Sequence, residues 1–229
     1  MHWSGLPNDF LLFLKPKNLL NMSNTIITIN RESGSGGREI AYRLGELLGL
    51  KVYDKAVIEG VAEKYQLSLQ EIERIREEKQ NFWDDFCQFY RQFGAAGDSY
   101  QPENKKVTSR GLFYAEAQIM RNLAQQESCI FVGRSGFHVF KDNPDAIRIF
   151  IIADRDVRIR RFAQRGGIDE ETAAKLIDEV DKARENYTKT FADTSRYDAR
   201  NYDLTINVSP YTTESVAAFL AEHIRRRMA

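Results

Sequence analysis

The sequence predicts an α/β fold in which a parallel sheet is covered by helices on both faces. Short apolar runs of strand length alternate with longer segments in which apolar residues recur at helical spacing. The strand segments are mostly apolar, as is typical of strands buried on both faces. The chain has 229 residues, 42% hydrophobic and 29% charged, which is enough for one large domain with insertions.

The expected strands are separated by helical segments along the chain. We predict strands at 26–29, 51–53, 129–132, 147–152 and 204–208. The first helix carries Ile40, Leu44, Leu47 and Leu48 at helical spacing and ends at Gly49. Further helices are expected at 55–65, 68–93, 109–126, 156–165, 169–189 and 213–227.

Overall charge and composition exclude several classes of protein. The 33 basic and 33 acidic residues balance, which argues against a partner that is a nucleic acid polymer. The apolar run at 10–14 is too short to cross a bilayer, so no membrane association is expected. Cys87 and Cys129 form no metal-ligand or disulfide pattern, which fits a reducing cytoplasm, and Cys129 is expected to be buried. The three histidines are scattered, and no metal site is predicted from side chains alone.

The first 23 residues are expected to form an N-terminal tail outside the domain at 24–229. Clear periodicity begins only after Met22. We expect Met22 to be the natural start; the alternative is a genuine tail that docks loosely.

A glycine-rich turn follows the first strand and precedes the first helix. Gly34, Gly36 and Gly37 lack a β-carbon, so the backbone can turn sharply and approach a ligand closely. Successive amides can then point inward as an anion nest, and the start of the helix adds its positive end. Ser33, Gly34, Ser35, Gly36 and Gly37 are therefore expected to bind the phosphates of a nucleotide.

This loop departs from the usual pattern G-x-x-x-x-G-K-[ST]. Aligned on Gly36, the sequence places Arg31 at the first glycine, Gly37 at the lysine and Arg38 at the hydroxyl. A loop one residue longer would put Arg38 in the lysine's place, followed by Glu39. Either alignment leaves an arginine within reach, and Glu39 or water could replace the hydroxyl as a magnesium ligand. A tight turn without a ligand is the alternative.

Two more polar segments follow strand ends and should meet the glycine loop in one crevice. They are the GRSG motif after Val132 and an arginine-rich segment after Ile152. On a helix, Arg158, Arg161 and Arg165 fall on one face. Such a face could be merely solvated, but its position after a strand favours a phosphate site.

The ordered segments TITINRESGSGGREI, VYDKAVI, FVGRSGFHVF, IRIFIIADRDVRIRR and NYDLTINVS resemble the cytidylate kinase-like family, relatives of the P-loop nucleoside monophosphate kinases. The resemblance covers about residues 24–227. It implies a P-loop three-layer sandwich with a helical monophosphate-binding insertion at about 54–110 and a helical lid at about 155–200. It also implies phosphoryl transfer from ATP, with Mg²⁺, to a nucleoside monophosphate, CMP or dCMP by analogy.

The resemblance assigns roles to particular residues. Ser33 to Gly37 match the family's phosphate loop, and Arg134 matches an arginine that holds the acceptor nucleotide. Ser135 stands where better-known cytidylate kinases have an aspartate, which puts cytosine recognition in doubt. The expected catalytic residues are Arg38, Arg158, Arg161 and Arg184. The expected acceptor-binding residues are Arg134, Ser135, Asp181, Arg110 and Asp54.

Simpler roles remain open for several of these residues. Asp54 could cap the next helix. Asp181 and Arg184 could form only a surface ion pair. A nucleotide-binding protein without turnover is the second hypothesis, because the lysine and hydroxyl are missing. The third is an assembly module, with a homodimer built on the aromatic helix at 82–93.

Overall fold

The computed structural model of the chain describes residues 24–54 and 109–228. The expected tail, the helices at 55–65 and 68–93 and the assembly surface on the second of them lie outside these residues. The elements are β1 (Ile26–Arg31), α1 (Gly37–Leu48), β2 (Lys51–Tyr53), α5 (Ser109–Gln126), β3 (Cys129–Val132), α6 (Gly136–Val139), β4 (Ile147–Ile152), α7 (Arg155–Gly166), α8 (Glu170–Ala192), a 3₁₀ turn (Ala199–Asn201), β5 (Leu204–Asn207) and α9 (Thr213–Met228).

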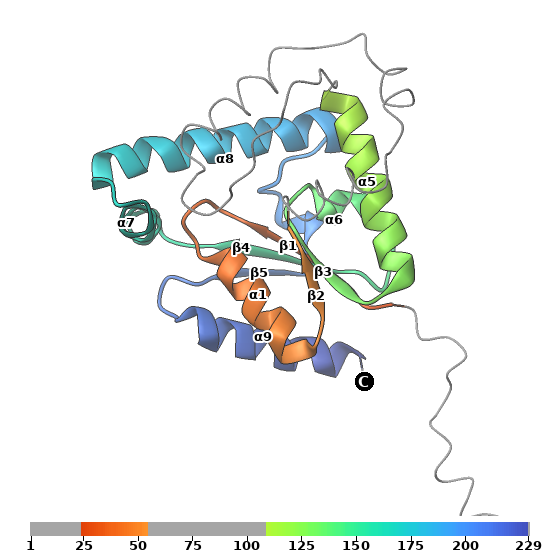
Figure 1. Ribbon diagram of the computed structural model, residues 1–229. Helices are drawn as coiled ribbons and strands as arrows, with labels where there is room; N and C mark the ends of the chain where they lie inside the picture. Colours follow the sequence, from red (N-terminus) through yellow and green to blue (C-terminus); the bar gives the residue numbers. More distant parts are fainter. Residues whose placement is uncertain (1–23, 55–108, 229) are drawn as a thin grey trace, which may run out of the picture.

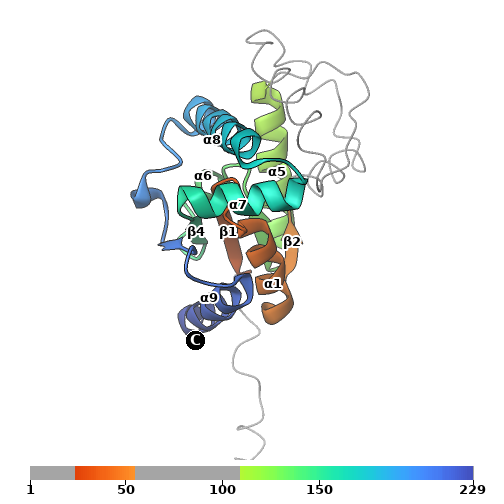
Figure 2. The ribbon, with the colours of Figure 1, turned by 90° about the vertical axis from the view of Figure 1, so that its left-hand side faces the viewer.

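The strands of the described residues form a five-stranded sheet in the order β2-β3-β1-β4-β5. Every neighbouring pair is parallel, which confirms the predicted α/β sandwich. The chain builds β2 and β3 on one side of β1, and β4 and β5 on the other. The carboxyl ends of β1, β3 and β4 therefore meet at one edge, where ligands bind in open α/β folds. Figure 2 looks onto this edge, with α7 across the front.

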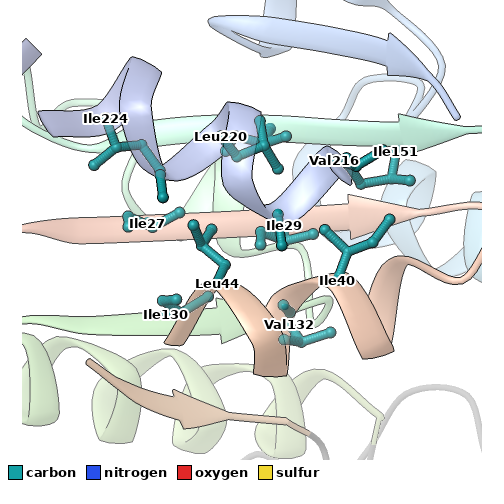
Figure 3. Close-up of a cluster of buried hydrophobic side chains, with 14 of the residues drawn as sticks. Ile27, Ile29, Ile40, Leu44, Ile130, Val132, Ile151, Val216, Leu220 and Ile224 are labelled. Atoms are coloured by element: carbon teal, nitrogen blue, oxygen red, sulfur yellow. The ribbon is translucent and has the colours of Figure 1, made fainter. Parts of the chain in front are cut away.

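Helices cover both faces of the sheet (Figure 1). On one face, Ile27 and Ile29 of β1 pack with Leu44 of α1 and Leu220 of α9 in a cluster of fully buried aliphatic side chains (Figure 3). On the other face, α5 and α6 cover a second cluster that includes Met120. Alternate residues of each central strand point to opposite faces. Both sets must be apolar, which explains the nearly continuous hydrophobic runs of β1 and β4.

The structure differs from the predicted elements in two informative places. Strand β1 runs two residues past its expected end, because Asn30 and Arg31 pair with Phe150 and Ile151 of β4. This extension carries Arg31 to the edge where the glycine loop begins. The short helix α6 was not predicted; it starts from Ser135, whose φ is 50°.

Two further expectations can be compared with the described residues. Cys129 is fully buried in β3, as expected, and burial raises the pKa of its thiol to about 12. In the described ranges, no helix has the length and apolar character needed to cross a membrane.

Candidate active site

Residues 32–36 form a tight loop between β1 and α1. Gly34 and Gly36 have φ values of 80° and 82°, in the left-handed region that favours glycine. A β-carbon on Gly34 would lie only 2.5 Å from the carbonyl oxygen of Arg158. The Ser35 hydroxyl donates to the Glu32 carbonyl at 2.9 Å and accepts the Gly37 N–H at 3.4 Å. The loop thus bends sharply before α1 begins, with α7 packed directly against it.

Arg158 fastens α7 to this loop. Its guanidinium donates to the carbonyl oxygens of Ser33 at 3.3 Å and Ala153 at 3.1 Å. It also lies 2.7 Å from Asp181 of α8, in a pair whose side chains are about one-tenth exposed. The backbone N–H of Ser33 donates to the other oxygen of Asp181 at 2.9 Å. The predicted residues Ser33, Arg158 and Asp181 therefore share one buried hydrogen-bond network.

Arg161 reaches the same loop from the next turn of α7. Its Nη1 donates to the Ser35 carbonyl at 3.0 Å, and its Nη2 donates to Tyr211 at 3.4 Å. Arg165, expected on the same face, places its guanidinium 5.8 Å from the ring centre of Phe162. The helical spacing thus correctly directs Arg158 and Arg161 to the loop, whereas Arg165 stacks on its own helix.

Two more arginines surround Asp181. Arg184 lies 3.6 Å away on α8, as the D-x-x-R spacing predicted. Arg196, which lies after α8, is 2% exposed and 3.7 Å from the same carboxylate oxygen. Its Nη2 donates to the Arg31 carbonyl. Burial, followed by the charge of Arg184, lowers the pKa of Arg196. Arg158, Arg184 and Arg196 thus surround Asp181, and Glu32 lies 3.5 Å from Arg158, so the arginines of this cluster outnumber its carboxylates.

No pattern in the sequence indicated a role for Arg196. It lies in an irregular segment between α8 and β5, so no helical period or glycine motif marks it.

Arg134 and Ser135 form a second loop at the same sheet edge, after β3. Gly133, Arg134 and Ser135 have φ values of 81°, 53° and 50°. Two successive non-glycine residues in the left-handed region are costly and occur most often at functional sites. The sharp turn of this loop therefore holds two residues in a backbone conformation of higher energy.

Buried partners hold the side chains of this loop. Arg134 Nη2 is 2.7 Å from Glu116 Oε1 of α5, with both side chains less than one-tenth exposed. Tyr187 of α8 donates to the other oxygen of Glu116 at 3.2 Å. Burial, followed by the charge of Glu116, raises the pKa of the Tyr187 hydroxyl well above its usual range. The Ser135 hydroxyl lies 3.4 Å from that of Thr188. The loop is thus tied to both α5 and α8.

Arg38 contacts a carboxylate at the end of β2. Its Nε and Nη2 donate to Asp54 at 3.0 and 2.7 Å, and Tyr42 donates to the same oxygen at 2.8 Å. Asp54 is buried, so this contact fastens α1 to β2. Arg110 lies in the first turn of α5, but its side chain is outside the described residues.

The family model that matches this chain is described as the cytidylate kinase-like family, and it matches residues 26–210. The match takes in both strand-end loops, α7 and α8. The chain belongs to the cytidylate kinase-like family.

The individual relatives share about a quarter of their aligned residues with this chain. A cytidylate kinase of Methanopyrus kandleri is 25% identical over 198 residues, which covers 86% of this chain and 91% of the relative. A cytidylate kinase of Thermoplasma acidophilum is 24% identical over 201 residues, with the same coverage. A solved structure of an uncharacterized protein from Eubacterium ventriosum superimposes with a TM-score of 0.66, at 26% identity, and covers 89% of this chain and 99% of that one.

Members of this kinase-like family would use a magnesium ion, and the residues beside the loop are chemically compatible with one. Glu39, in the first turn of α1, is exposed and accepts a hydrogen bond from Thr213 at 3.4 Å. Carboxylate and hydroxyl oxygens suit Mg²⁺, which keeps several waters and bridges nucleotide phosphates. Within the described part of the chain, no cluster of three or more histidine, cysteine, aspartate or glutamate side chains could hold a metal.

Proposed function

We propose that this protein transfers the γ-phosphoryl group of ATP to a nucleoside monophosphate, with CMP or dCMP as the leading acceptor. The observation that carries the proposal is the convergence of α7 on the glycine loop. Arg158 and Arg161 both bond to loop carbonyls, so their positive charges are fixed beside the place where a polyphosphate would lie. Phosphoryl transfer depends mainly on such positioning and on charge around the moving group.

Each part of the site has a role in this proposal. The backbone amides of Ser33 to Glu39 and the start of α1 bind the ATP phosphates. Arg158, Arg161 and Arg184 stabilise the charge of the transferring group, and Arg38 contributes its backbone amide and a nearby charge. Glu39 would hold Mg²⁺, which when bound neutralises phosphate charge.

The second loop and the end of β2 form the acceptor side. Arg134 binds the acceptor's phosphate, and its pair with Glu116 fixes the guanidinium in place. Ser135, Asp181, Arg110 and Asp54 complete this side in the proposal. Ser135 has a hydroxyl where the better-known cytidylate kinases have an aspartate, whose carboxylate could accept a hydrogen bond from the cytosine amino group. A kinase for another small molecule is therefore the alternative.

Residues 155–200 are proposed to act as the lid that excludes water and limits ATP hydrolysis. Helix α7 ends at Gly166, and Gly167 caps it with φ of 62°, donating to the Ala163 carbonyl. This left-handed residue joins α7 to α8 and is the proposed hinge. The alternative is an ordinary helix-ending turn, which has the same backbone geometry.

A coupled assay of ADP release tests the proposal. The purified protein is given MgATP with CMP, dCMP, UMP, AMP or GMP in turn. We expect release of ADP that depends on the acceptor and is greatest with CMP or dCMP. Arg184→Ala should lower this rate by about 100-fold. The matched control is Lys182→Ala, an exposed residue of the same helix, which should turn over normally.

A nucleotide-binding protein without turnover is the second candidate. It is favoured by Gly37 and Arg38 at the positions of the usual lysine and hydroxyl. Binding of MgATP by calorimetry without ADP release for any acceptor would support this candidate and exclude the first.

A further inference from the structure

Compared with the usual phosphate loop, the cationic residue and one glycine have changed places in this chain, at Arg31 and Gly37. In the pattern G-x-x-x-x-G-K, the first position is glycine and the last is lysine. With Gly36 as the second glycine, this chain has an arginine at the first position and a glycine at the last. Both positions bracket the same loop, so a cation at either end could reach the same phosphates.

The Arg31 side chain occupies the space that a side chain at residue 37 would need. A β-carbon on Gly37 would lie 2.5 Å from Arg31 Cβ and 3.0 Å from its Cγ. Real β-carbons essentially never approach other atoms this closely. The stem of Arg31 therefore crosses directly over Gly37, at the point where the usual lysine begins.

The other end of Arg31 reaches the acceptor loop. A β-carbon on Gly133 would overlap Nη1 of Arg31 and lie 3.3 Å from its Cζ. Gly133 directly precedes Arg134 and follows β3, the neighbour of β1 in the sheet. The guanidinium thus lies between the ATP loop and the loop assigned to the acceptor. In the proposed reaction, the transferring phosphoryl group passes through this region.

The backbone of Arg31 is also fixed. It pairs with Ile151 in the sheet, and its carbonyl accepts a hydrogen bond from the buried Arg196. A fixed backbone restricts where a side chain can reach, and preorganised donors are the most effective at stabilising developing charge.

We infer that Arg31 is the phosphate-binding cation of this site, in the place that other phosphate loops give to lysine. This inference rests on the proposed function. A guanidinium can contact two phosphate oxygens at once, which a lysine ammonium cannot. Arg38, the other candidate from the spacing, is directed to the end of β2, where it contacts Asp54, whereas Arg31 crosses Gly37 and reaches Gly133.

The first test compares Arg31→Gln with Arg31→Lys, because both retain the stem over Gly37. MgATP binding is measured by calorimetry, with inorganic tripolyphosphate as a second probe that lacks the nucleoside. We expect Arg31→Gln to weaken both by at least about 10-fold, and to lower kcat by about 100-fold where turnover is seen. Arg31→Lys should retain most of the binding. Equal binding by the wild type and Arg31→Gln would overturn the inference.

The second test moves the charge to the other end of the loop. Arg31→Gly with Gly37→Lys restores the usual arrangement and removes the Arg31 β-carbon that a side chain at residue 37 would meet, and Arg31→Gly with Gly37→Met is its neutral control. Both place a side chain 3.3 Å from Ile151 Cβ, so both meet the same crowding. We expect the lysine variant to recover binding and the methionine variant not to. A purely structural Arg31 would give the same result for both, which would overturn the inference.

The outcomes separate this inference from the proposed function. If the wild type binds MgATP but phosphorylates no acceptor, the kinase proposal fails, and the binding comparison still decides the role of Arg31. If the wild type is an active kinase and Arg31→Gln behaves as the wild type does, the assignment of Arg31 fails alone. Thermal unfolding identifies any variant that does not fold. If the double variants at residues 31 and 37 do not fold, the comparison of Arg31→Gln with Arg31→Lys decides the role of Arg31.

Discussion

The backbone N–H of Ser33 donates a hydrogen bond to Asp181 Oδ1 at 2.9 Å, joining residues 148 positions apart in the sequence. Ser33 lies in the glycine loop and Asp181 on α8. The loop amide thus holds a carboxylate oxygen, which shows that its geometry suits an oxyanion. The same carboxylate offsets the charges of Arg158, Arg184 and Arg196 around it. A phosphate oxygen that took the Ser33 amide would displace Asp181 and alter how α8 is held.

Replacing Asp181 with asparagine should destabilise the protein. The amide oxygen can still accept from Ser33, but the buried Arg158 loses the nearer of its two anions and keeps only Glu32, whose carboxylate is 3.5 Å from its Nε. Breaking one side of a buried ion pair costs several kcal/mol, so we expect the free energy of unfolding to fall by about 2 to 4 kcal/mol. Urea denaturation of the purified variant measures this change.

Asp178→Asn is the matched control for this variant. Asp178 lies on the same helix and pairs with Arg155 at 2.6 Å, but both side chains are more than half exposed. Exposed pairs contribute about 0 to 1 kcal/mol, so the control should unfold nearly as the wild type does. Equal losses in the two variants would show that burial of the Asp181 network is not what stabilises the loop.

Much of the fold was predictable because the physical signal for it is local. Strands β3 and β4 and helix α5 have their predicted bounds, since runs of branched apolar residues and helical spacing are read over short windows. The glycine loop was also predictable, since a strand, a glycine cluster and a helix in that order leave few alternatives.

The partners of the site residues were much less predictable, because they depend on long-range packing. The spacing placed Arg158 and Arg161 correctly, yet nothing local indicates that Arg158 also bonds to Asp181, 23 residues away. Arg38 was expected to replace the lysine from its position in the loop. In the structure Arg38 donates to Asp54, at the end of β2, and the position of β2 depends on its pairing with β3.

Arg134→Ala should impair use of the acceptor more than use of ATP. Arg134 lies on the second loop, directly after Gly133 and β3, and its guanidinium pairs with Glu116 of α5. We expect the KM for the acceptor to rise by about 10-fold or more, because a charge-assisted hydrogen bond to phosphate is lost. Steady-state kinetics with each substrate varied in turn measures the two KM values.

Loss of stability must be separated from loss of binding in this variant, because Glu116 would be left buried without Arg134. Arg134→Ala with Glu116→Gln removes that unpaired charge, and the raised acceptor KM should persist in the double variant. Arg121→Ala, an exposed residue of α5, is the matched control. A rise confined to the KM for ATP would contradict the assignment of Arg134.

Arg38→Ala and Arg31→Ala separate the two candidates for the missing lysine. If Arg31 binds the phosphates, Arg31→Ala should weaken MgATP binding more than Arg38→Ala does. Arg38→Ala should instead lower stability, because Asp54 is buried and would lose two hydrogen bonds. Calorimetry with MgATP and urea denaturation of both variants give the comparison. The opposite ranking for binding would return the cationic role to Arg38.

The stability of the protein should decrease as the pH falls below neutrality, through His138. Burial, followed by the charge of Lys141, lowers the pKa of this imidazole from its usual 6.5. Between the folded pKa and 6.5, the unfolded chain binds more protons than the folded one, so stability rises with pH there. The contribution is complete above about pH 6.5 and is lost as the pH falls through the folded pKa.

Urea denaturation from pH 7.5 to 5 in the wild type and in His138→Gln isolates the dependence of stability on the protonation of His138. The titration of the His138 ring by NMR gives the pKa directly. A midpoint at or above 6.5, or an unchanged slope in the variant, would show that burial of His138 does not disfavour its charged form.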